Sequence, residues 1–226
     1  MYKNYFKRLF DIVSSGMALI ILLPIFAYLA YLVKTRLGSP VLFTQVRPGK
    51  DNKLFKMYKF RSMTDERDAD GKLLPDDMRM TTFGKKLRES SLDELPELIN
   101  IFKGDMSVVG PRPQLVRDMV FFSDEEMQRQ SVLPGLTGLA QINGRNNISW
   151  EDKFKYDLQY IKNISFLEDM RIIYRTVFKV ANQDDINTDG METAEDYGDY
   201  LLRIGKIGKA EYDSNQSKAN KLINRM

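Results

Sequence analysis

The fold of this chain is decided by one apolar stretch near the N-terminus, IVSSGMALIILLPIFAYLAYLV, residues 12–33. Its 22 residues carry no charge, and no other run in the chain is both as long and as apolar. As an α-helix the stretch would reach about 33 Å, slightly more than the roughly 30 Å hydrocarbon core of a bilayer. The sequence therefore predicts a membrane segment at this place.

Two features favour a re-entrant hairpin over a single crossing. Pro24 lies near the middle of the stretch, where a proline removes a backbone hydrogen bond and costs about 3 kcal/mol, so we expect a break there. Both flanks are basic, and positive flanks stay on the cytoplasmic side of a membrane. The basic residues are Lys3, Lys7 and Arg8 before the stretch, and Lys34, Arg36, Arg47 and Lys50 after it. We predict a re-entrant membrane hairpin at residues 1–36; the alternatives are a kinked span and, less favoured because no small-residue cleavage pattern follows, a signal peptide.

The stretch that follows the hairpin carries an excess of positive charge. Between Lys34 and Arg61 there are eight Lys or Arg residues and a single acid, Asp51. Each such charge near an anionic leaflet contributes about 1 kcal/mol to binding, so attachment to the membrane surface is favoured. An ordinary solvated basic face is the alternative.

Composition excludes several chemistries. The chain has 34 Lys and Arg residues against 31 Asp and Glu residues, and it contains neither His nor Cys. Disulfides, thiolate nucleophiles, Cys/His zinc sites and imidazole acid–base catalysis are therefore excluded. A nucleophile must come from Asp, Glu, Lys, Tyr, Ser or Thr, and a metal should be a hard cation bound through oxygen. The net charge of +3 is too small to indicate a nucleic-acid partner, and none is expected.

The remaining sequence predicts a mainly α fold with a small β-hairpin (α+β). Residues 41–46 and 54–63 favour strands around a Pro-Gly turn. Helices are predicted over residues 82–89, 93–102, 117–132, 150–161 and 166–181. The apolar faces of the last two helices indicate either core packing or contact with a membrane interface. We expect a cytosolic catalytic domain over residues 37–182, followed by a loosely attached polar C-terminal tail over residues 183–226 with a short helix near 197–204.

The polar segment over residues 64–80 matches a calcium-binding loop only in part. Glu66 stands where such a loop begins with Asp, and Asp77 stands where a bidentate Glu is needed. The preceding residues also favour a strand where a flanking helix is required. A flexible loop is the better interpretation.

Candidate chemistry begins at Ser91-Leu92-Asp93-Glu94-Leu95-Pro96-Glu97. Ser91 and Glu94 match a capping box, so the two acids have a plain structural explanation. Arg112 stands between Pro111 and Pro113, which prepare a rigid arginine suited to a phosphate. Two further turns, residues 134–138 and 143–145, offer glycines with exposed backbone amides. An acidic pair with several arginines and Lys59 suits metal-assisted phosphoryl chemistry.

At these residues the sequence resembles the monotopic phosphoglycosyl transferases, or bacterial sugar transferases. The resemblance runs from about Phe6 to Lys179 and rests on six ordered motifs, so it is highly specific. The motifs are KRLFD at residues 7–11, FTQVRPG at 43–49, YKFRSM at 58–63, SLDELP at 91–96, GDMSVVGPRP at 104–113, and PGLTG at 134–138 with NGR at 143–145. The chain is similar to compact members that use a diacetylbacillosamine-type nucleotide sugar. The family often breaks its membrane helix at Ser-Pro, where this chain has Leu23-Pro24.

The resemblance implies transfer of a sugar 1-phosphate from a UDP-sugar to polyprenyl (undecaprenyl) phosphate, with release of UMP and a requirement for Mg²⁺. Asp93 would form an aspartyl phosphosugar intermediate, and Glu94 would hold the metal with Asp93 or assist proton transfer. Phosphate or uridine contacts would come from Lys59, Arg88, Arg112 and Arg145, with Pro111 and Pro113 holding Arg112. Asp157 and Asp169 would be supporting or structural acids.

The resemblance also implies a place in the cell and in metabolism. The enzyme would lie monotopically on the cytoplasmic face of the bacterial inner membrane, in contact with membrane lipids, and would start a glycoconjugate such as a capsule or glycoprotein glycan. The competing hypotheses are a membrane-bound glycosyltransferase that releases UDP and a non-catalytic, membrane-anchored interaction module. No motif selects a particular sugar, and the oligomeric state stays unknown.

Overall fold

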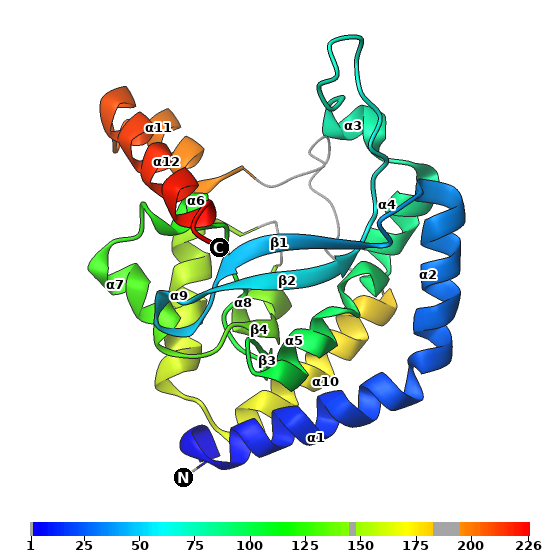
Figure 1. The fold of residues 1–226 in the computed structure, drawn as a ribbon. Helices are drawn as coiled ribbons and strands as arrows, with labels where there is room; N and C mark the ends of the chain where they lie inside the picture. The colour runs from blue at the N-terminus through cyan, green and yellow to red at the C-terminus, as the bar shows by residue number, and fades with distance from the viewer. Residues whose placement is uncertain (1, 145–147, 183–194) are drawn as a thin grey trace.

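The computed structural model describes residues 2–144, 148–182 and 195–226. The fold is mainly helical with two small sheets (Figure 1). In chain order the elements of the first half are η1 (Tyr2–Asn4), α1 (Phe6–Ile21), α2 (Leu23–Leu37), β1 (Leu42–Pro48), η2 (Lys50–Asn52), β2 (Leu54–Phe60), α3 (Asp76–Arg79), α4 (Thr82–Glu89), η3 (Leu92–Glu94), α5 (Glu97–Lys103) and β3 (Ser107–Val109). They continue with α6 (Val116–Met119), α7 (Asp124–Met127), η4 (Gln128–Ser131), β4 (Gly135–Thr137), α8 (Leu139–Ile142), α9 (Trp150–Lys162), α10 (Phe166–Asn182), α11 (Tyr197–Arg203) and α12 (Lys209–Ile223).

The apolar N-terminal stretch folds into two helices that meet at a bend. The axes of α1 and α2 differ by 64°. Leu22 separates the two helices, and Pro24 lies in the first turn of α2, where its missing N–H leaves no helical hydrogen bond unmade. Within the described residues no single helix is long and apolar enough to cross a membrane, whereas the bent pair taken together has sufficient length and apolar character.

Helix α1 is tied to the rest of the protein by the charged residues at its beginning. Arg8 donates hydrogen bonds of 2.6 and 2.8 Å to the carbonyls of Ile101 and Phe102 at the end of α5, which suits the negative end of a helix. One oxygen of buried Asp11 accepts hydrogen bonds from the Ser107 hydroxyl and from the Val108 backbone N–H. The N-terminal helix therefore holds α5 and β3 in place.

Asp169 of α10 forms a second tie to the N-terminus. Its fully buried carboxylate lies 2.6 Å from Lys7 Nζ and accepts hydrogen bonds from the hydroxyls of Tyr2 and Tyr160. Tyr160 belongs to α9, so one carboxylate joins the N-terminus, α9 and α10. Asp169 is thus a structural acid in this fold.

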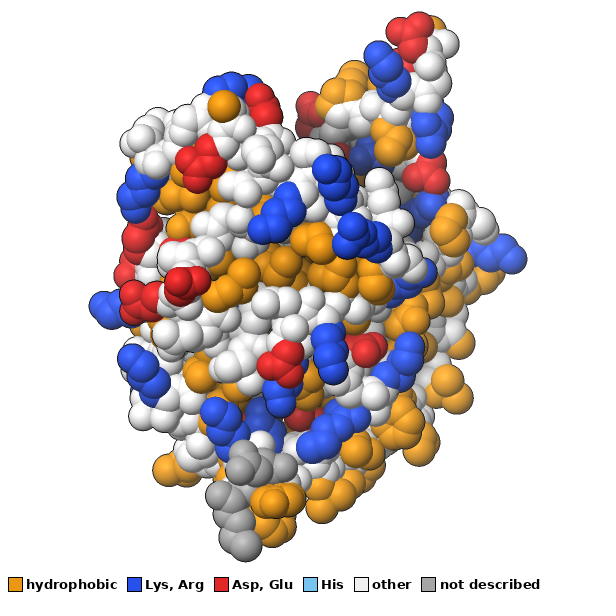
Figure 2. All heavy atoms as spheres, turned by 60° about the vertical axis from the view of Figure 1, so that its left-hand side comes forward, with side chains coloured by type: hydrophobic (Ala, Val, Ile, Leu, Met, Phe, Trp, Pro, Cys, Tyr) orange, Lys and Arg blue, Asp and Glu red, His pale blue; other side chains and the backbone are white. Residues whose placement is uncertain are grey.

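The bent helix pair leaves a broad apolar surface uncovered. Figure 2 shows hydrophobic side chains gathered along the lower right margin of the molecule, the side on which α1 and α2 lie. The exposed residues are Phe6, Leu9, Val13, Met17, Ile20, Ile21, Leu23, Ile25, Tyr28 and Tyr31 on these helices, joined by Phe166, Leu167, Tyr174, Val177 and Phe178 on α10. Contiguous exposed apolar patches usually mark a site of contact with a membrane, a ligand or another protein.

The predicted β-hairpin is present, and a second sheet was not predicted. Strands β1 and β2 pair antiparallel from Leu42 with Phe60 to Pro48 with Leu54. Strands β3 and β4 pair in parallel, and each has only three residues, too few for a period-two pattern to be read from sequence.

Two predicted helices are interrupted. The helix expected over residues 93–102 is divided into η3 and α5 at Pro96, since proline cannot donate the helical hydrogen bond. The helix expected over residues 117–132 becomes α6, α7 and η4, because Ser123 and Glu126 form a capping box that starts a new helix.

The segment over residues 64–80 forms a projecting arm (Figure 1). Isolated antiparallel β-bridges join Arg67 with Leu73 and Met63 with Met80.

The C-terminal segment differs from the loosely attached tail that was expected. Tyr197 and Leu201 of α11 are buried with Trp150 and Phe154 of α9. Ala219 of α12 is buried against α6. The reason is that α11 presents aromatic residues on one face, whereas α12 packs through one small alanine that a hydropathy pattern does not single out.

Candidate active site

The acidic pair lies on the short helix η3, and its backbone is unusual. Ser91, which precedes η3, adopts a left-handed conformation with φ of 55°, a region that side-chain-bearing residues rarely occupy and that often marks functional sites. The Ser91 side chain makes no capping hydrogen bond. The capping-box interpretation of Ser91 and Glu94 is therefore wrong, and the Glu94 side chain is directed to other partners.

Glu94 is held by two cations from distant parts of the chain. Its Oε1 accepts hydrogen bonds from Lys59 Nζ at 2.7 Å and from Arg112 Nη2 at 2.6 Å. Lys59 comes from β2, and Arg112 from the loop after β3. Although burial opposes ionisation, Arg112 and Lys59 hold the pKa of Glu94 well below its usual range. Glu94 is thus an ionised carboxylate at every physiological pH.

Asp93 lies beside this cluster without a direct partner. Its side chain is buried, with 8% of the residue exposed, and no described residue donates a hydrogen bond to it. Burial and the charge of Glu94 raise the pKa of Asp93 to about 6, while Lys59, Arg88 and Arg112 counteract the rise. At neutral pH Asp93 is therefore mostly a carboxylate whose lone pairs are uncommitted, which is the form that a nucleophile requires.

A third carboxylate, Glu97, was missed in the sequence analysis. It is 1% exposed, and its Oε1 lies 3.3 Å from Lys59 Nζ in a geometry that forms no hydrogen bond. Burial raises the pKa of Glu97 to about 7, against the attraction of Lys59. Its position three residues after Glu94, inside a predicted helix, could have indicated that it shares a face with Glu94.

The loop that carries Arg112 is held in place by buried prolines and by a hydrogen bond to its backbone. Pro111 and Pro113 are buried, and the Arg112 carbonyl accepts a 2.7 Å hydrogen bond from Arg129 Nη2. Arg129 is itself buried and pairs with Asp157 at 2.7 Å. Asp157 therefore supports Arg112 through Arg129 and does not belong to the acidic cluster. No pattern in the sequence connects Arg129 with Asp157, which lies 28 positions away.

Glycines after β3 and around β4 bring two backbones into contact. Gly110 N donates to the Thr137 carbonyl, and Gly135 N donates to the Pro111 carbonyl at 2.9 Å. A Cβ on Gly135 would lie 2.0 Å from Gly110 N. Gly135 and Gly138 are both buried, so the expectation that the glycines of residues 134–138 offer exposed amides is wrong. The glycines instead fix the position of the Arg112 loop.

Arg88 and Arg145 are the two remaining residues that were predicted to contact phosphate or uridine. Arg88 of α4 donates from Nε to the Ser62 hydroxyl at 2.9 Å, and its charge contributes to lowering the pKa of Asp93. Arg145 lies outside the described residues. The structure thus brings Asp93, Glu94, Lys59 and Arg112 together, with Arg88 acting on Asp93 at longer range.

The carboxylates of the site suit a magnesium ion that is also bound by substrate. Mg²⁺ usually takes one or two protein carboxylates and completes its shell with phosphate oxygens and water. Asp93 and Glu94 supply hard oxygen ligands of this kind. Over the described ranges no group of three or more acids is arranged to hold a metal ion.

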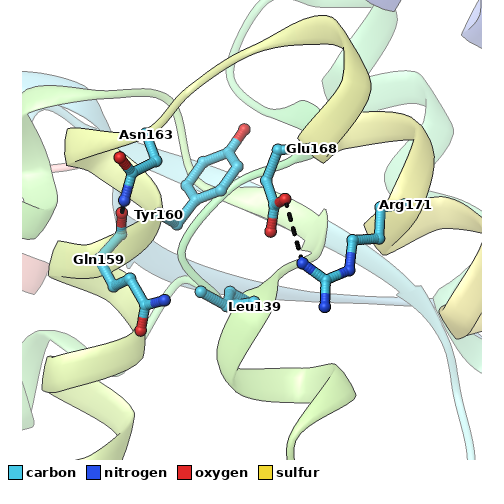
Figure 3. Close-up of a pocket in the computed structure, with 6 residues that line it drawn as sticks. All are labelled: Leu139, Gln159, Tyr160, Asn163, Glu168 and Arg171. Carbon is cyan, nitrogen blue, oxygen red and sulfur yellow. Dashed lines mark hydrogen bonds and ion pairs between the residues drawn. The ribbon is translucent and has the colours of Figure 1, made fainter.

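A separate cavity between α9 and α10 is too small for a nucleotide sugar. It measures about 150 Å³, whereas small-molecule sites typically have roughly 300 to 1,000 Å³. Figure 3 shows its lining, with the Glu168–Arg171 ion pair (3.6 Å) on one side and the Asn163 amide bonded to the Gln159 carbonyl on the other. None of its six lining residues belongs to the group of carboxylates formed by Asp93, Glu94 and Glu97.

A buried carboxylate with free lone pairs, next to a carboxylate paired with lysine and arginine, suits phosphoryl transfer. The comparisons with known proteins identify the family. Residues 2–183 match the family model described as bacterial sugar transferase. The chain therefore belongs to the bacterial sugar transferase family, and the resemblance found in its motifs is confirmed.

Three relatives illustrate the range of the family. The chain is 48% identical over 189 residues to "Uncharacterized sugar transferase EpsL" of Bacillus subtilis, covering 84% of this chain and 94% of that protein. It is 45% identical to "UDP-glucose:undecaprenyl-phosphate glucose-1-phosphate transferase" of Klebsiella pneumoniae, over 77% of this chain and 40% of that protein. It is 39% identical to "Undecaprenyl-phosphate galactose phosphotransferase" of Salmonella typhimurium, over 80% of this chain and 41% of that protein. The chain thus spans less than half of the two longer relatives.

Proposed function

We propose that this protein transfers a sugar 1-phosphate from a UDP-sugar to undecaprenyl phosphate and releases UMP. The relatives from Klebsiella and Salmonella are named for reactions of this class. The observation that carries the proposal is the contrast within the acidic pair. Glu94 is committed to Lys59 and Arg112, while Asp93 has no hydrogen-bond partner among the described residues and is free to attack.

In the first step an oxygen of Asp93 attacks the β-phosphorus of the UDP-sugar. The new Asp93–phosphorus bond replaces the bond to the bridging oxygen, and the electron pair leaves with UMP. Lys59 and Arg112, which flank Glu94, would neutralise the phosphoryl oxygens. The sugar stays attached to the transferred phosphoryl group throughout, so Asp93 carries a sugar 1-phosphoryl group after this step.

In the second step a phosphate oxygen of undecaprenyl phosphate attacks the same phosphorus. The Asp93 carboxylate leaves with its electron pair and is regenerated, and the product is a lipid diphosphate sugar. Splitting one difficult transfer into two displacements is the general advantage of a covalent intermediate. Asp93 and Glu94 would hold Mg²⁺, which supplies further neutralisation of phosphate charge when bound.

We also propose that the protein acts from the cytoplasmic face of the bacterial inner membrane. In this arrangement residues 1–36 form the re-entrant hairpin with its break next to Pro24, and residues 37–182 form the catalytic domain. The exposed apolar faces of α1, α2 and α10 support the placement. A 570 Å³ apolar groove, lined by residues of the N-terminus, α1 and α10, opens on the same side. Such seating brings a lipid phosphate and a soluble sugar nucleotide to one place.

The proposal is tested by resolving the nucleotide that the protein releases. Detergent-solubilised protein is incubated with Mg²⁺, undecaprenyl phosphate and a panel of UDP-sugars, with Asp93→Asn and the exposed arm variant Asp77→Asn as matched controls. We expect UMP from wild type and from Asp77→Asn, and none from Asp93→Asn. Release of UDP would instead identify a glycosyltransferase, and release of no nucleotide from any donor would favour an anchored interaction module.

The covalent step has a test of its own. A UDP-sugar labelled with ³²P in the β-phosphate is supplied without lipid acceptor, and the protein is precipitated. We expect label on wild type and none on Asp93→Asn, with later addition of undecaprenyl phosphate removing the label into lipid. UMP release by wild type without any protein-bound label would contradict the aspartyl intermediate while leaving the overall transfer in place.

A further inference from the structure

The C-terminal segment, residues 195–226, is built into the packing beside the candidate site. At its centre Tyr197 is buried among three aromatic rings, with centroids 5.0 Å from Trp150, 5.2 Å from Phe154 and 5.8 Å from Phe122. Its hydroxyl donates to Glu126 at 2.8 Å. The segment therefore closes an aromatic cluster whose other members come from α9 and from the loop after α6.

One buried carboxylate joins this segment to α6. Asp118 accepts a 2.9 Å hydrogen bond from the Tyr197 backbone N–H and a 3.2 Å bond from the Leu115 N–H. Leu115 caps α6 and stands two residues after Pro113 of the Arg112 loop. A surface ion pair of 2.7 Å between Arg117 and Asp196 reinforces the same junction. The C-terminal segment thus fixes the exit of the Arg112 loop.

The aromatic cluster also reaches the residue that holds the Arg112 carbonyl. The Arg129 guanidinium lies 5.5 Å from the Phe122 ring centre and 6.0 Å from the Phe154 ring centre. Both rings touch Tyr197. Arg129 in turn donates to the Arg112 carbonyl. Tyr197 is therefore connected to Arg112 first through the two phenylalanine rings and then through Arg129.

Helix α12 extends the contact to the β-hairpin that carries Lys59. Ala219 is fully buried with Val116 and Met119 of α6. Val46 of β1 and Leu54 of β2 pack into the same cluster. Both cations that hold Glu94 are therefore carried by elements that the C-terminal segment braces.

We propose that residues 195–226 form a positioning clamp that keeps Arg112 on Glu94, with Tyr197 as its central positioning residue. Loosening the clamp frees the Arg112 loop and weakens the Arg112–Glu94 pair. The consequence for catalysis rests on the proposed function, whereas the effect on the ion pair does not.

Two glycine variants in this segment give a matched test. A Cβ on Gly198 would lie 2.5 Å from the Phe121 ring, whereas a Cβ on Gly208 would meet no atom within 4 Å. Gly198→Ala therefore wedges α11 away from its seat, and Gly208→Ala adds the same methyl group without a clash. If Gly198→Ala fails to fold, judged by loss of its far-UV circular dichroism signal, Tyr197→Phe serves instead, because it removes only the hydroxyl bond to Glu126.

The first readout is the reactivity of Arg112 towards phenylglyoxal, followed by peptide mass spectrometry. Arg112 is protected by its pair with Glu94 although its side chain is 39% exposed, and Arg171 of α10, 63% exposed, serves as an internal reference. Gly198→Ala should raise the modification rate of Arg112 about 3- to 10-fold, as couplings between packed neighbours do, with Arg171 and the Gly208→Ala protein unchanged. An unchanged rate at Arg112 overturns the clamp, whether or not the wild type transfers sugar phosphate.

The second readout is a double-mutant cycle with Arg112→Ala, measured on kcat/KM for the UDP-sugar. If the clamp acts through Arg112, Gly198→Ala should lower kcat/KM about 3- to 10-fold in the wild type and have little effect once Arg112 is gone. Equal losses in both backgrounds would overturn the proposal. Raised reactivity of Arg112 in a wild type that releases no nucleotide would support the clamp and contradict only the proposed function.

Discussion

At the scale of single residues, the two neighbouring acids have opposite environments. Glu94 is neutralised by Lys59 and Arg112, while Asp93 is buried with no direct partner in the described part of the chain. One carboxylate is therefore ionised and paired, and the other has lone pairs that no described residue engages; the proposed mechanism assigns the nucleophile to the second. The left-handed backbone of Ser91 turns the chain just before the two acids, Asp93 and Glu94.

The raised pKa of Asp93 predicts a pH dependence of the reaction. Protonated Asp93 cannot attack phosphorus, so kcat/KM should fall as pH decreases through about 6. Initial rates between pH 5 and 8 at constant ionic strength measure this fall in kcat/KM. Asp77→Asn should show the same pH profile as the wild type. A profile that is flat down to pH 5 would contradict the proposal that Asp93 is the attacking carboxylate.

The same shift predicts an effect on stability. The pKa of Asp93 is raised in the folded protein from 3.8 to about 6, so folding is favoured at low pH and this contribution is lost as pH rises through about 6. The full shift corresponds to roughly 3 kcal/mol. Asp93→Asn, which cannot ionise, should therefore unfold at a higher temperature than wild type at pH 8, with the difference vanishing near pH 4. Thermal unfolding in detergent at both pH values measures it, and equal Tm values at pH 8 would refute it.

At the scale of elements, the Arg112 loop depends on a buried ion pair between η4 and α9. Removing Arg129 alone leaves the Asp157 charge buried without a partner, which should cost about 3 to 5 kcal/mol. Replacing both, as Arg129→Met with Asp157→Leu, should restore most of the stability. Activity should stay low in the double variant, because the Arg112 carbonyl has lost its donor. Urea unfolding and kcat/KM, measured on the wild type, the Arg129 variant and the double variant, separate the two effects. Full activity in the double variant would show that the hydrogen bond from Arg129 to the Arg112 carbonyl is dispensable.

Some helices and strands could be predicted from the sequence and others could not. The amphipathic helices α9 and α10 and the hairpin of β1 and β2 follow from periodicity and turn chemistry, and they agree with prediction. Strands β3 and β4 are too short for a pattern. The acidic pair and its cations were identified through motifs. Glu97 could have been found from its spacing to Glu94. By contrast, Arg129 acts through contacts with Arg112 and Asp157, 17 and 28 positions away, which spacing along the chain does not reveal.

At the scale of the whole molecule, the apolar face predicts how the protein is held on a membrane. Ile20 and Leu23, at the bend, are 77% and 66% exposed, so Ile20→Asp with Leu23→Asp should abolish binding to phospholipid vesicles without unfolding the domain. Leu73→Asp, at an exposed apolar position on the arm, should leave binding unchanged. Co-sedimentation with vesicles of mixed anionic and neutral lipid measures the effect. Retained binding of the double variant would mean that the bend does not enter the bilayer.

The ties of α1 have a consequence for biogenesis. Lys7, Arg8 and Asp11 find their partners 162, 93 and 96 residues further along the chain. A ribosome releases the N-terminal helices first and those partners much later. On the proposed membrane placement, the apolar segment is therefore available to a bilayer while its polar partners are still unmade, and the Arg112 loop becomes fixed only later. Translation order would then keep the candidate site from being completed before the N-terminal helices have been made.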